Sequence, residues 1–290
     1  MGTTDIVSRV ASSFKKKVKS ELSNRLKSFY VVGSYAFGKI SKQRPDINFL
    51  LIFDGFTSPD DYLAIGEICR DLEKEFAKET TVKIEFRPFR YIKPRYKNDT
   101  EVSVNPILIS TGEIEATGGV IFNKWFTEGL KSAHKLLHGK DFLKSLKVGD
   151  ITQKDLIKGA MFDLMFFSIP VSRAPAQYTK EETNLLLNEA LVNAKNMAYL
   201  GIETAMTDKE LKQKDYLKYF KNKETIASFY KERYGNDVEK MIKRIFQVRK
   251  QYLTLKDDPE VGKEMFSIAL NLANIIRDKI FSKVVPDKVY

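Results

Sequence analysis

The chain has 290 residues, of which 43% are hydrophobic and 30% charged, with a formal net charge of +11 and a single cysteine. This length and composition suit a globular protein of one or two domains and exclude a disulfide framework within one chain. No apolar run approaches a membrane span of about 18 residues, and the N-terminus lacks the apolar core of a signal peptide. We therefore expect a cytoplasmic protein that does not bind membranes.

The positive charge is concentrated at the N-terminal end, where residues 1–50 hold ten lysines and arginines against three acids. Such an excess favours a phosphate-rich partner, either a nucleotide or a nucleic acid. For Lys15–Lys17 a solvated helix face is the alternative interpretation. Lys39, Lys42 and Arg44 differ because they flank the motif described below.

In chain order, an apolar residue at every fourth position from Ile6 to Leu26 predicts a first helix of about twenty residues. A short buried strand at 29–32, a turn with one helical turn at 33–44 and a second strand at 46–53 follow. Ser58-Pro59 is a helix start, and that helix should run to about Lys78 and bury Cys69. The strictly alternating segment 81–89 predicts a third strand, and 104–109 a strand that ends the sheet.

From about Phe122 the apolar spacing becomes helical, and a helix through Leu137 should carry His134 and His138 four residues apart. No third ligand accompanies these histidines, so a structural role is favoured over a metal site. The glycine-bearing segment 110–119 is the predicted boundary between a sheet domain at 1–115 and a helical domain at 120–290. The predicted fold class is therefore α+β, with a small mixed sheet domain followed by an all-helical bundle.

Three groups of residues are candidates for chemistry. Gly33-Ser34 follows a buried strand, where a tight turn with exposed N–H groups and a hydroxyl can bind phosphate oxygens. Asp46 and Asn48 begin the next strand two residues apart, so both side chains should lie on one face. Glu85 lies on the polar side of the third strand and could approach that pair. Oxygen ligands beside a phosphate-binding turn suit Mg²⁺ with a nucleoside triphosphate.

The run from Val31 to Phe53, VVGSYAFGKISKQRPDINFLLIF, resembles the signature of the DNA polymerase β nucleotidyltransferase superfamily. That signature has Gly-Ser after a strand, Asp-x-Asp at the start of the next strand and a third acid on a later strand. The resemblance covers roughly residues 1–110. A sheet domain followed by a helical domain is also similar to the architecture of the aminoglycoside nucleotidyltransferases. The segment Leu137–Asp141 weakly resembles the region after their sheet.

The resemblance implies that Gly33 and Ser34 hold the triphosphate, while Asp46, position 48 and Glu85 hold Mg²⁺ or Mn²⁺. Asp46 and Glu85 would be the catalytic acids, and Glu85 would help to deprotonate the acceptor hydroxyl. The acceptor would attack the α-phosphorus and expel pyrophosphate. Basic side chains would attract the triphosphate at the rim of the site: Lys39, Lys42, Arg44 and Arg87.

One position departs from the family pattern: residue 48 is Asn rather than Asp. An amide offers a neutral oxygen and lacks the charge that two divalent ions require between them. The first hypothesis is therefore a metal-dependent nucleotidyltransferase that acts on a small-molecule, protein or nucleic-acid hydroxyl, with the helical domain supplying part of the acceptor site. The alternative is a degenerate nucleotide-binding or interaction protein of the same fold, like the antitoxins of this superfamily. An oligomer is compatible with both hypotheses.

Overall fold

The computed structural model describes residues 3–38, 45–84, 101–117, 124–161, 164, 183–213, 218–219 and 223–284. The chain divides into two compact units, Met1–Val148 and Gly149–Tyr290. The first unit contains a five-stranded sheet and the second is helical, so the protein has the predicted α+β class. Within the described ranges, none of the helices combines the length and the apolar character that crossing a bilayer requires.

The sheet of the first unit is mixed, with the order β3-β4-β2-β1-β5. Its strands are β1 (Leu26–Val32), β2 (Asp46–Phe53), β3 (Thr81–Ile84), β4 (Glu101–Ser110) and β5 (His134–Gly139). β1 pairs antiparallel with β2 and β5, whereas β4 pairs parallel with β2 and β3. The strand predicted to end the sheet, β4, is not at an edge, because it pairs with β3 on one side and with β2 on the other. The two edge strands are β3 and β5.

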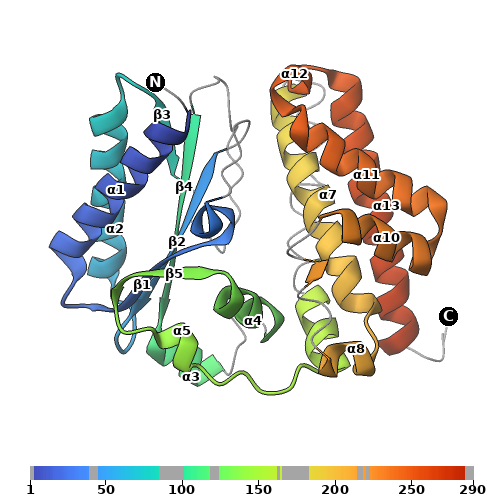
Figure 1. Ribbon diagram of the computed structural model, residues 1–290, viewed down its shortest axis with the longest axis horizontal. Coiled ribbons are helices and arrows are strands. Elements are labelled where there is room, and N and C mark those ends of the chain that lie inside the picture. Colours follow the sequence, from blue (N-terminus) through green and yellow to red (C-terminus); the bar gives the residue numbers. More distant parts are fainter. Residues whose placement is uncertain are drawn as a thin grey trace. The chain divides into compact units, whose positions relative to one another are not determined.

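Two helices cover the first face of this sheet (Figure 1). α1 (Thr3–Leu22) buries the predicted apolar stripe, and α2 (Pro59–Phe76) begins at a Ser58 cap whose hydroxyl accepts a hydrogen bond from the Asp61 N–H. Cys69 on α2 is buried among these apolar side chains, and burial raises the pKa of its thiol to about 12. The prediction that this helix buries Cys69 is confirmed.

The second face of the sheet is divided along its strands into an apolar part and a polar part. The apolar part packs against α3 (Thr111–Thr117), α4 (Lys124–Ser132) and α5 (Phe142–Ser145). Its buried strand residues are Tyr30, Val32, Leu50, Ile52, Ile107 and Ile109, and the helices contribute Leu130 and Leu143. The polar part lies where β2 and β4 begin. There, the positions that continue the apolar rows carry Asp46, Asn48, Glu101, Ser103 and Asn105.

The predicted helix through His134 and His138 is wrong, because the helix α4 ends at Ser132 and both histidines lie in β5. β5 pairs with β1 through five residue pairs, so the sheet recruits a segment from beyond the predicted boundary at 110–119. The first unit consequently extends to Val148. The spacing of apolar residues did not reveal this strand, because β5 is partly exposed along its length and shows no clear alternation of buried and exposed residues.

The second unit is built around α7 (Thr183–Ala205), which packs against α13 (Pro259–Val284), α10 (Lys223–Tyr234) and α11 (Asn236–Lys250). Residues 153–161 are also helical, and the shorter helices are α8 (Asp208–Lys212) and α12 (Tyr252–Leu255). The buried Tyr230 hydroxyl donates to the Ala198 carbonyl of α7 at 2.8 Å. Gly201 permits this contact, because a β-carbon there would overlap the hydroxyl. Tyr230 is thus a core residue of the second unit.

Candidate functional site

The polar part of the second sheet face, which we call the polar end, contains the predicted Asp46 and Asn48. In the parallel register between β2 and β4, Asp46 pairs with Ser103 and Asn48 pairs with Asn105. On the other side of β2, Asn48 pairs with Val32, the residue before Gly33. The structure therefore brings Asp46, Asn48 and the Gly33-Ser34 turn together, as the alternation of strand residues predicts.

Asn48 is at the centre of the polar end. Its Nδ2 donates to Asp46 Oδ2 at 3.2 Å, and its Oδ1 accepts from Asn105 Nδ2 at 3.1 Å. A β-carbon added to Gly33 would lie 3.4 Å from the same Nδ2. The amide of Asn48 therefore contacts each of the groups around it, and both of its polar atoms have partners.

The Gly33-Ser34 turn opens η1 (Gly33–Phe37), one short 3₁₀ helix. Gly33 has φ of 75°, which lies in the left-handed region where a glycine carries no steric penalty. Its N–H donates to the Ala133 carbonyl at 3.3 Å, so Gly33 supplies a backbone conformation rather than a free donor. The Ser34 side chain is exposed and remains accessible to a ligand.

Several predicted site residues lie outside the described residues, namely Lys39, Lys42, Arg44, Glu85 and Arg87. The structure therefore does not test their roles. It does change one premise of the Glu85 assignment, because β3, which ends at Ile84, is separated from β2 by β4. Since neighbouring strands are about 4.8 Å apart, an acid on β4 starts closer to Asp46 than an acid on β3.

Sequence reasoning missed three polar residues of β4: Glu101, Ser103 and Asn105. All three are buried, with exposed fractions of 3%, 1% and 0%. They alternate with Val102 and Val104, and this period of two is the signal that could have revealed them. The predicted strand began at Val104, so the first polar positions were read as loop.

The donor set of the polar end fits one hard cation better than two. Asp46 is a carboxylate at a partly exposed position, and its neighbours in register are the neutral Asn48, Ser103 and Asn105. The other carboxylate of the polar end, Glu101, is buried two residues before Ser103. No cluster of three or more histidine, cysteine or acidic side chains suitable for a metal occurs within the described ranges. Two divalent ions need anionic ligands between them, whereas one ion that arrives with a triphosphate brings anionic oxygens of its own.

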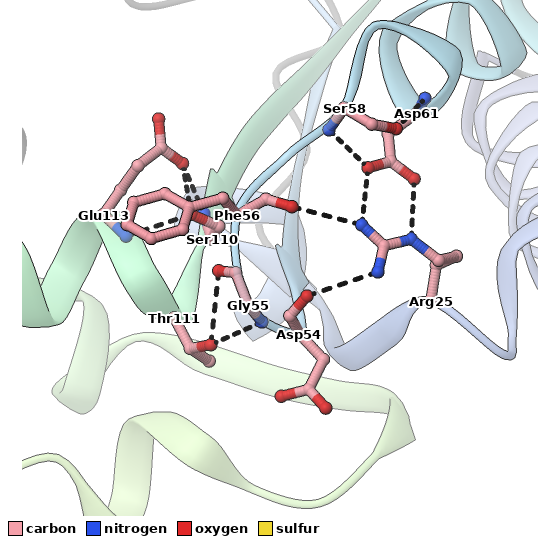
Figure 2. Close-up of polar contacts among 9 residues, drawn as sticks. All are labelled: Arg25, Asp54, Gly55, Phe56, Ser58, Asp61, Ser110, Thr111 and Glu113. Carbon is pink, nitrogen blue, oxygen red and sulfur yellow. Dashed lines mark hydrogen bonds and ion pairs between the residues drawn. The ribbon is translucent and has the colours of Figure 1, made fainter.

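A second polar network lies at the opposite end of the same strands and is structural (Figure 2). Arg25 donates to both carboxylate oxygens of the buried Asp61, at 3.2 and 2.9 Å, and to the carbonyls of Asp54 and Phe56. Burial favours the neutral form of Asp61, but hydrogen bonds from Arg25 and Ser58 outweigh it and lower the pKa of that carboxyl. The Arg25 guanidinium is directed at protein acceptors on α2 and on the segment after β2, so it ties α2 to the strand ends.

A third network joins β5 to the sheet beside the Gly33 turn. The His134 ring places Nδ1 2.9 Å from the Leu130 carbonyl and Nε2 3.3 Å from Asp141 Oδ1. The Tyr30 hydroxyl donates to Asp141 Oδ1 at 3.2 Å and accepts from the Leu143 N–H at 3.0 Å. Because these contacts use both ring nitrogens of His134, we assign the residue a structural role, as predicted.

Comparisons with known proteins agree with the first unit. The family described as a nucleotidyltransferase domain matches residues 11–104, a range that includes the Gly33-Ser34 turn, Asp46 and Asn48. No curated protein matches the chain significantly. Among solved structures, the chain is similar to the spectinomycin adenyltransferase AAD(9) from Enterococcus faecialis with ATP and spectinomycin. That similarity has 13% identity and a TM-score of 0.44 over 93% of this chain and 99% of the other.

Proposed function

Residues 11–104 are a nucleotidyltransferase domain of the DNA polymerase β type, and we propose that the protein transfers a nucleoside monophosphate from a nucleoside triphosphate to a hydroxyl acceptor. The observation that carries this proposal is the juxtaposition of Asp46 and the Gly33-Ser34 turn at the polar end, within the matched residues. A carboxylate beside an exposed hydroxyl and a tight turn is the arrangement that a metal-bound triphosphate requires.

The proposed roles follow from the chemistry of each group. Ser34 would bind phosphate oxygens, and the basic residues Lys39, Lys42, Arg44 and Arg87 would attract the triphosphate from solution. Asp46 and Glu85 would hold Mg²⁺ or Mn²⁺, with Asn48 beside them. The bound cation would neutralise charge on the triphosphate oxygens and on the leaving pyrophosphate.

The proposed reaction is a displacement at the α-phosphorus. Glu85 would accept the proton of the acceptor hydroxyl, and the acceptor oxygen would form a bond to the α-phosphorus. The bond between the α-phosphorus and its bridging oxygen to the β-phosphate would break, and pyrophosphate would leave with the electron pair. The products would be the acceptor nucleoside monophosphate ester and pyrophosphate.

Substitution of Asp46 by Asn tests the proposal. Asp46 is partly exposed at the start of β2, so D46N should keep the fold and its melting temperature. We expect the variant to lose Mn²⁺-dependent triphosphate binding, measured by calorimetry with each of the four triphosphates. The matched control is D54N, the same change at an exposed aspartate just after the other end of β2, which should bind the triphosphate like the parent. Equal Mn²⁺-dependent affinity in D46N and the parent would contradict the assignment.

The Asn at position 48 favours one second candidate, a nucleotide-binding protein that has lost transfer activity. The two functions differ in one measurement: release of pyrophosphate from α-labelled triphosphates in the presence of Mg²⁺ or Mn²⁺. Release that requires Asp46 supports the transferase. Metal-dependent binding of a triphosphate without any release, across a panel of small-molecule, protein and nucleic-acid acceptors, supports the binding protein.

A further inference from the structure

Asn105 is a buried amide that the proposed chemistry does not use. Its side chain is fully buried in β4, and its Nδ2 donates to Asn48 Oδ1 at 3.1 Å. Among the residues that the structure describes, its own Oδ1 is buried and has no hydrogen-bond partner. An amide in this position costs free energy because one acceptor is desolvated and unpaired, so an apolar side chain of similar shape would serve packing better.

The direction of the Asn48 amide explains what Asn105 does. A carboxylate can only accept hydrogen bonds, so the end of the Asn48 amide that faces Asp46 must be its NH₂ group. The carbonyl oxygen of Asn48 then faces β4, where only a donor can pair with it. Asn105 supplies that donor, and the hydrogen bonds run in one direction, from Asn105 to Asn48 and from Asn48 to Asp46.

This direction also decides what Asn48 can offer a cation. Its oxygen, the only atom of the amide that coordinates a hard cation, is turned toward Asn105 and away from Asp46. Its NH₂ group, which cannot coordinate, is turned toward the carboxylate. Rotation of the Asn48 amide alone would place its oxygen against the Asp46 carboxylate and its NH₂ group against the NH₂ group of Asn105.

We propose that Asn105 is a positioning residue that acts through Asn48 to orient Asp46, and that the site takes a single divalent cation together with the triphosphate. Asn48 then replaces the second anionic ligand without being a ligand itself. The inference rests on the proposed function and specifies its metal requirement. It accounts for both amides at once: Asn48 holds the carboxylate, and Asn105 holds Asn48.

The test is a titration of the full-length protein with Mn²⁺, in which the electron paramagnetic resonance signal of free Mn²⁺ measures how much is bound. Each titration contains one of the four α,β-methylene nucleoside triphosphates, which cannot release pyrophosphate. We expect one Mn²⁺ per chain in the complex with the analogue, once the Mn²⁺ held by unbound analogue is subtracted. N105L should weaken Mn²⁺ binding by about 10- to 100-fold, the usual effect of losing a group that orients a metal ligand.

A double-mutant cycle separates positioning from a merely structural role. If Asn105 acts through Asn48, N105L should weaken Mn²⁺ binding in the parent and have no further effect in an N48A background. N105A provides a second variant with a smaller side chain if the leucine disturbs the sheet. The control is V102A, buried on the same strand but on the opposite face of the sheet, which should bind Mn²⁺ like the parent.

Substitution of Asn48 by Asp tests the number of ions. A carboxylate there accepts the Asn105 N–H and adds a charge beside Asp46, so N48D should bind a second Mn²⁺ per chain and bind the first more tightly.

Three results would overturn the inference while leaving the proposed function intact. The first is parent-like Mn²⁺ affinity in folded N105L and N105A; the second is two ions bound to the parent. The third is an equal loss from N105L in the parent and in the N48A background, because Asn105 would then act independently of Asn48. Failure of the parent to bind Mn²⁺ with any of the four analogues would instead reject the proposed function, and the inference with it.

Discussion

At the scale of single residues, Gly33 connects backbone geometry with the candidate site. Its φ of 75° excludes an unstrained side chain, and a β-carbon there would lie in van der Waals contact with the Asn48 amide. Nearby Gly38 has φ of 70°, but a β-carbon there would meet nothing within 4 Å. The two glycines therefore share a backbone requirement and differ only in what lies beside them.

We predict that G33A and G38A each lower the free energy of unfolding by about 1–2 kcal/mol, the cost of a left-handed conformation with a side chain. Only G33A should also weaken Mn²⁺-dependent triphosphate binding, because relief of its backbone strain would shift the turn that lies against the Asn48 amide. Urea unfolding measures the first effect and calorimetry the second. Equal binding by the two variants would show that Gly33 has no role beyond the turn.

At the scale of secondary-structure elements, sequence patterns predicted the parts of the first unit that follow one clear period. The α1 stripe, the Ser58 start of α2 and the bounds of β2 all agree with the structure. β5 and the beginning of β4 were missed for a physical reason. β5 is an edge strand with mixed exposure, and β4 carries buried polar residues that resemble a loop in composition. Burial of polar side chains depends on tertiary context, which one sequence does not display.

The candidate site follows the same rule. Asp46, Asn48 and the Gly33-Ser34 turn were predicted from local spacing, and the structure places them together. Asn105 could not be predicted as their neighbour, because it lies 57 residues after Asn48 in the chain and the pairing depends on the parallel register of β2 with β4. The direction of the Asn48 amide likewise depends on that pairing.

The contact between α2 and the strand ends predicts a dependence of stability on pH. Asp61 accepts hydrogen bonds from Arg25 and from the Ser58 N–H, and its folded-state pKa lies below the ordinary value. A lowered carboxyl pKa stabilises the fold at pH values above the ordinary pKa of about 3.9, and this stabilisation is lost as the pH falls through the folded-state value.

We therefore predict that D61N is less stable than the parent by about 1–3 kcal/mol near pH 7, because a buried charged acceptor is lost. The difference should persist down to about pH 5 and shrink below about pH 4, where the parent loses its ionised carboxylate. Urea unfolding at a series of pH values measures it. D60N, in the same first turn of α2 but at an exposed position, is the control and should change stability less. A difference that does not vary with pH would contradict the ionic explanation.

At the scale of the whole molecule, the assignment of β5 to the first unit predicts which fragment folds. A fragment of residues 1–118, close to the boundary expected from sequence, lacks β5 and the apolar side chains of α4 and α5 that cover Tyr30 and Leu50. A fragment of residues 1–148 contains all of them. Open strand edges with an uncovered apolar face favour aggregation.

We predict that fragment 1–148 is monomeric and unfolds cooperatively, whereas fragment 1–118 aggregates. Size-exclusion chromatography with light scattering measures the first property, and thermal unfolding followed by circular dichroism measures the second. A monomeric, cooperatively folded fragment 1–118 would show that β5 and its helices are dispensable additions to the sheet.

The late arrival of β5 has a consequence for biosynthesis. As the nascent chain leaves the ribosome, β1 emerges early and pairs with β2 on one side, while its other partner follows roughly a hundred residues later. At about 5–20 residues per second, that interval lasts on the order of 5–20 seconds. During this time the second edge of β1 is open to other chains, so crowded polysomes are where this protein is most exposed to misassembly. A slow codon cluster before residue 134 would prolong the interval, whereas a holdase chaperone on that edge would protect it.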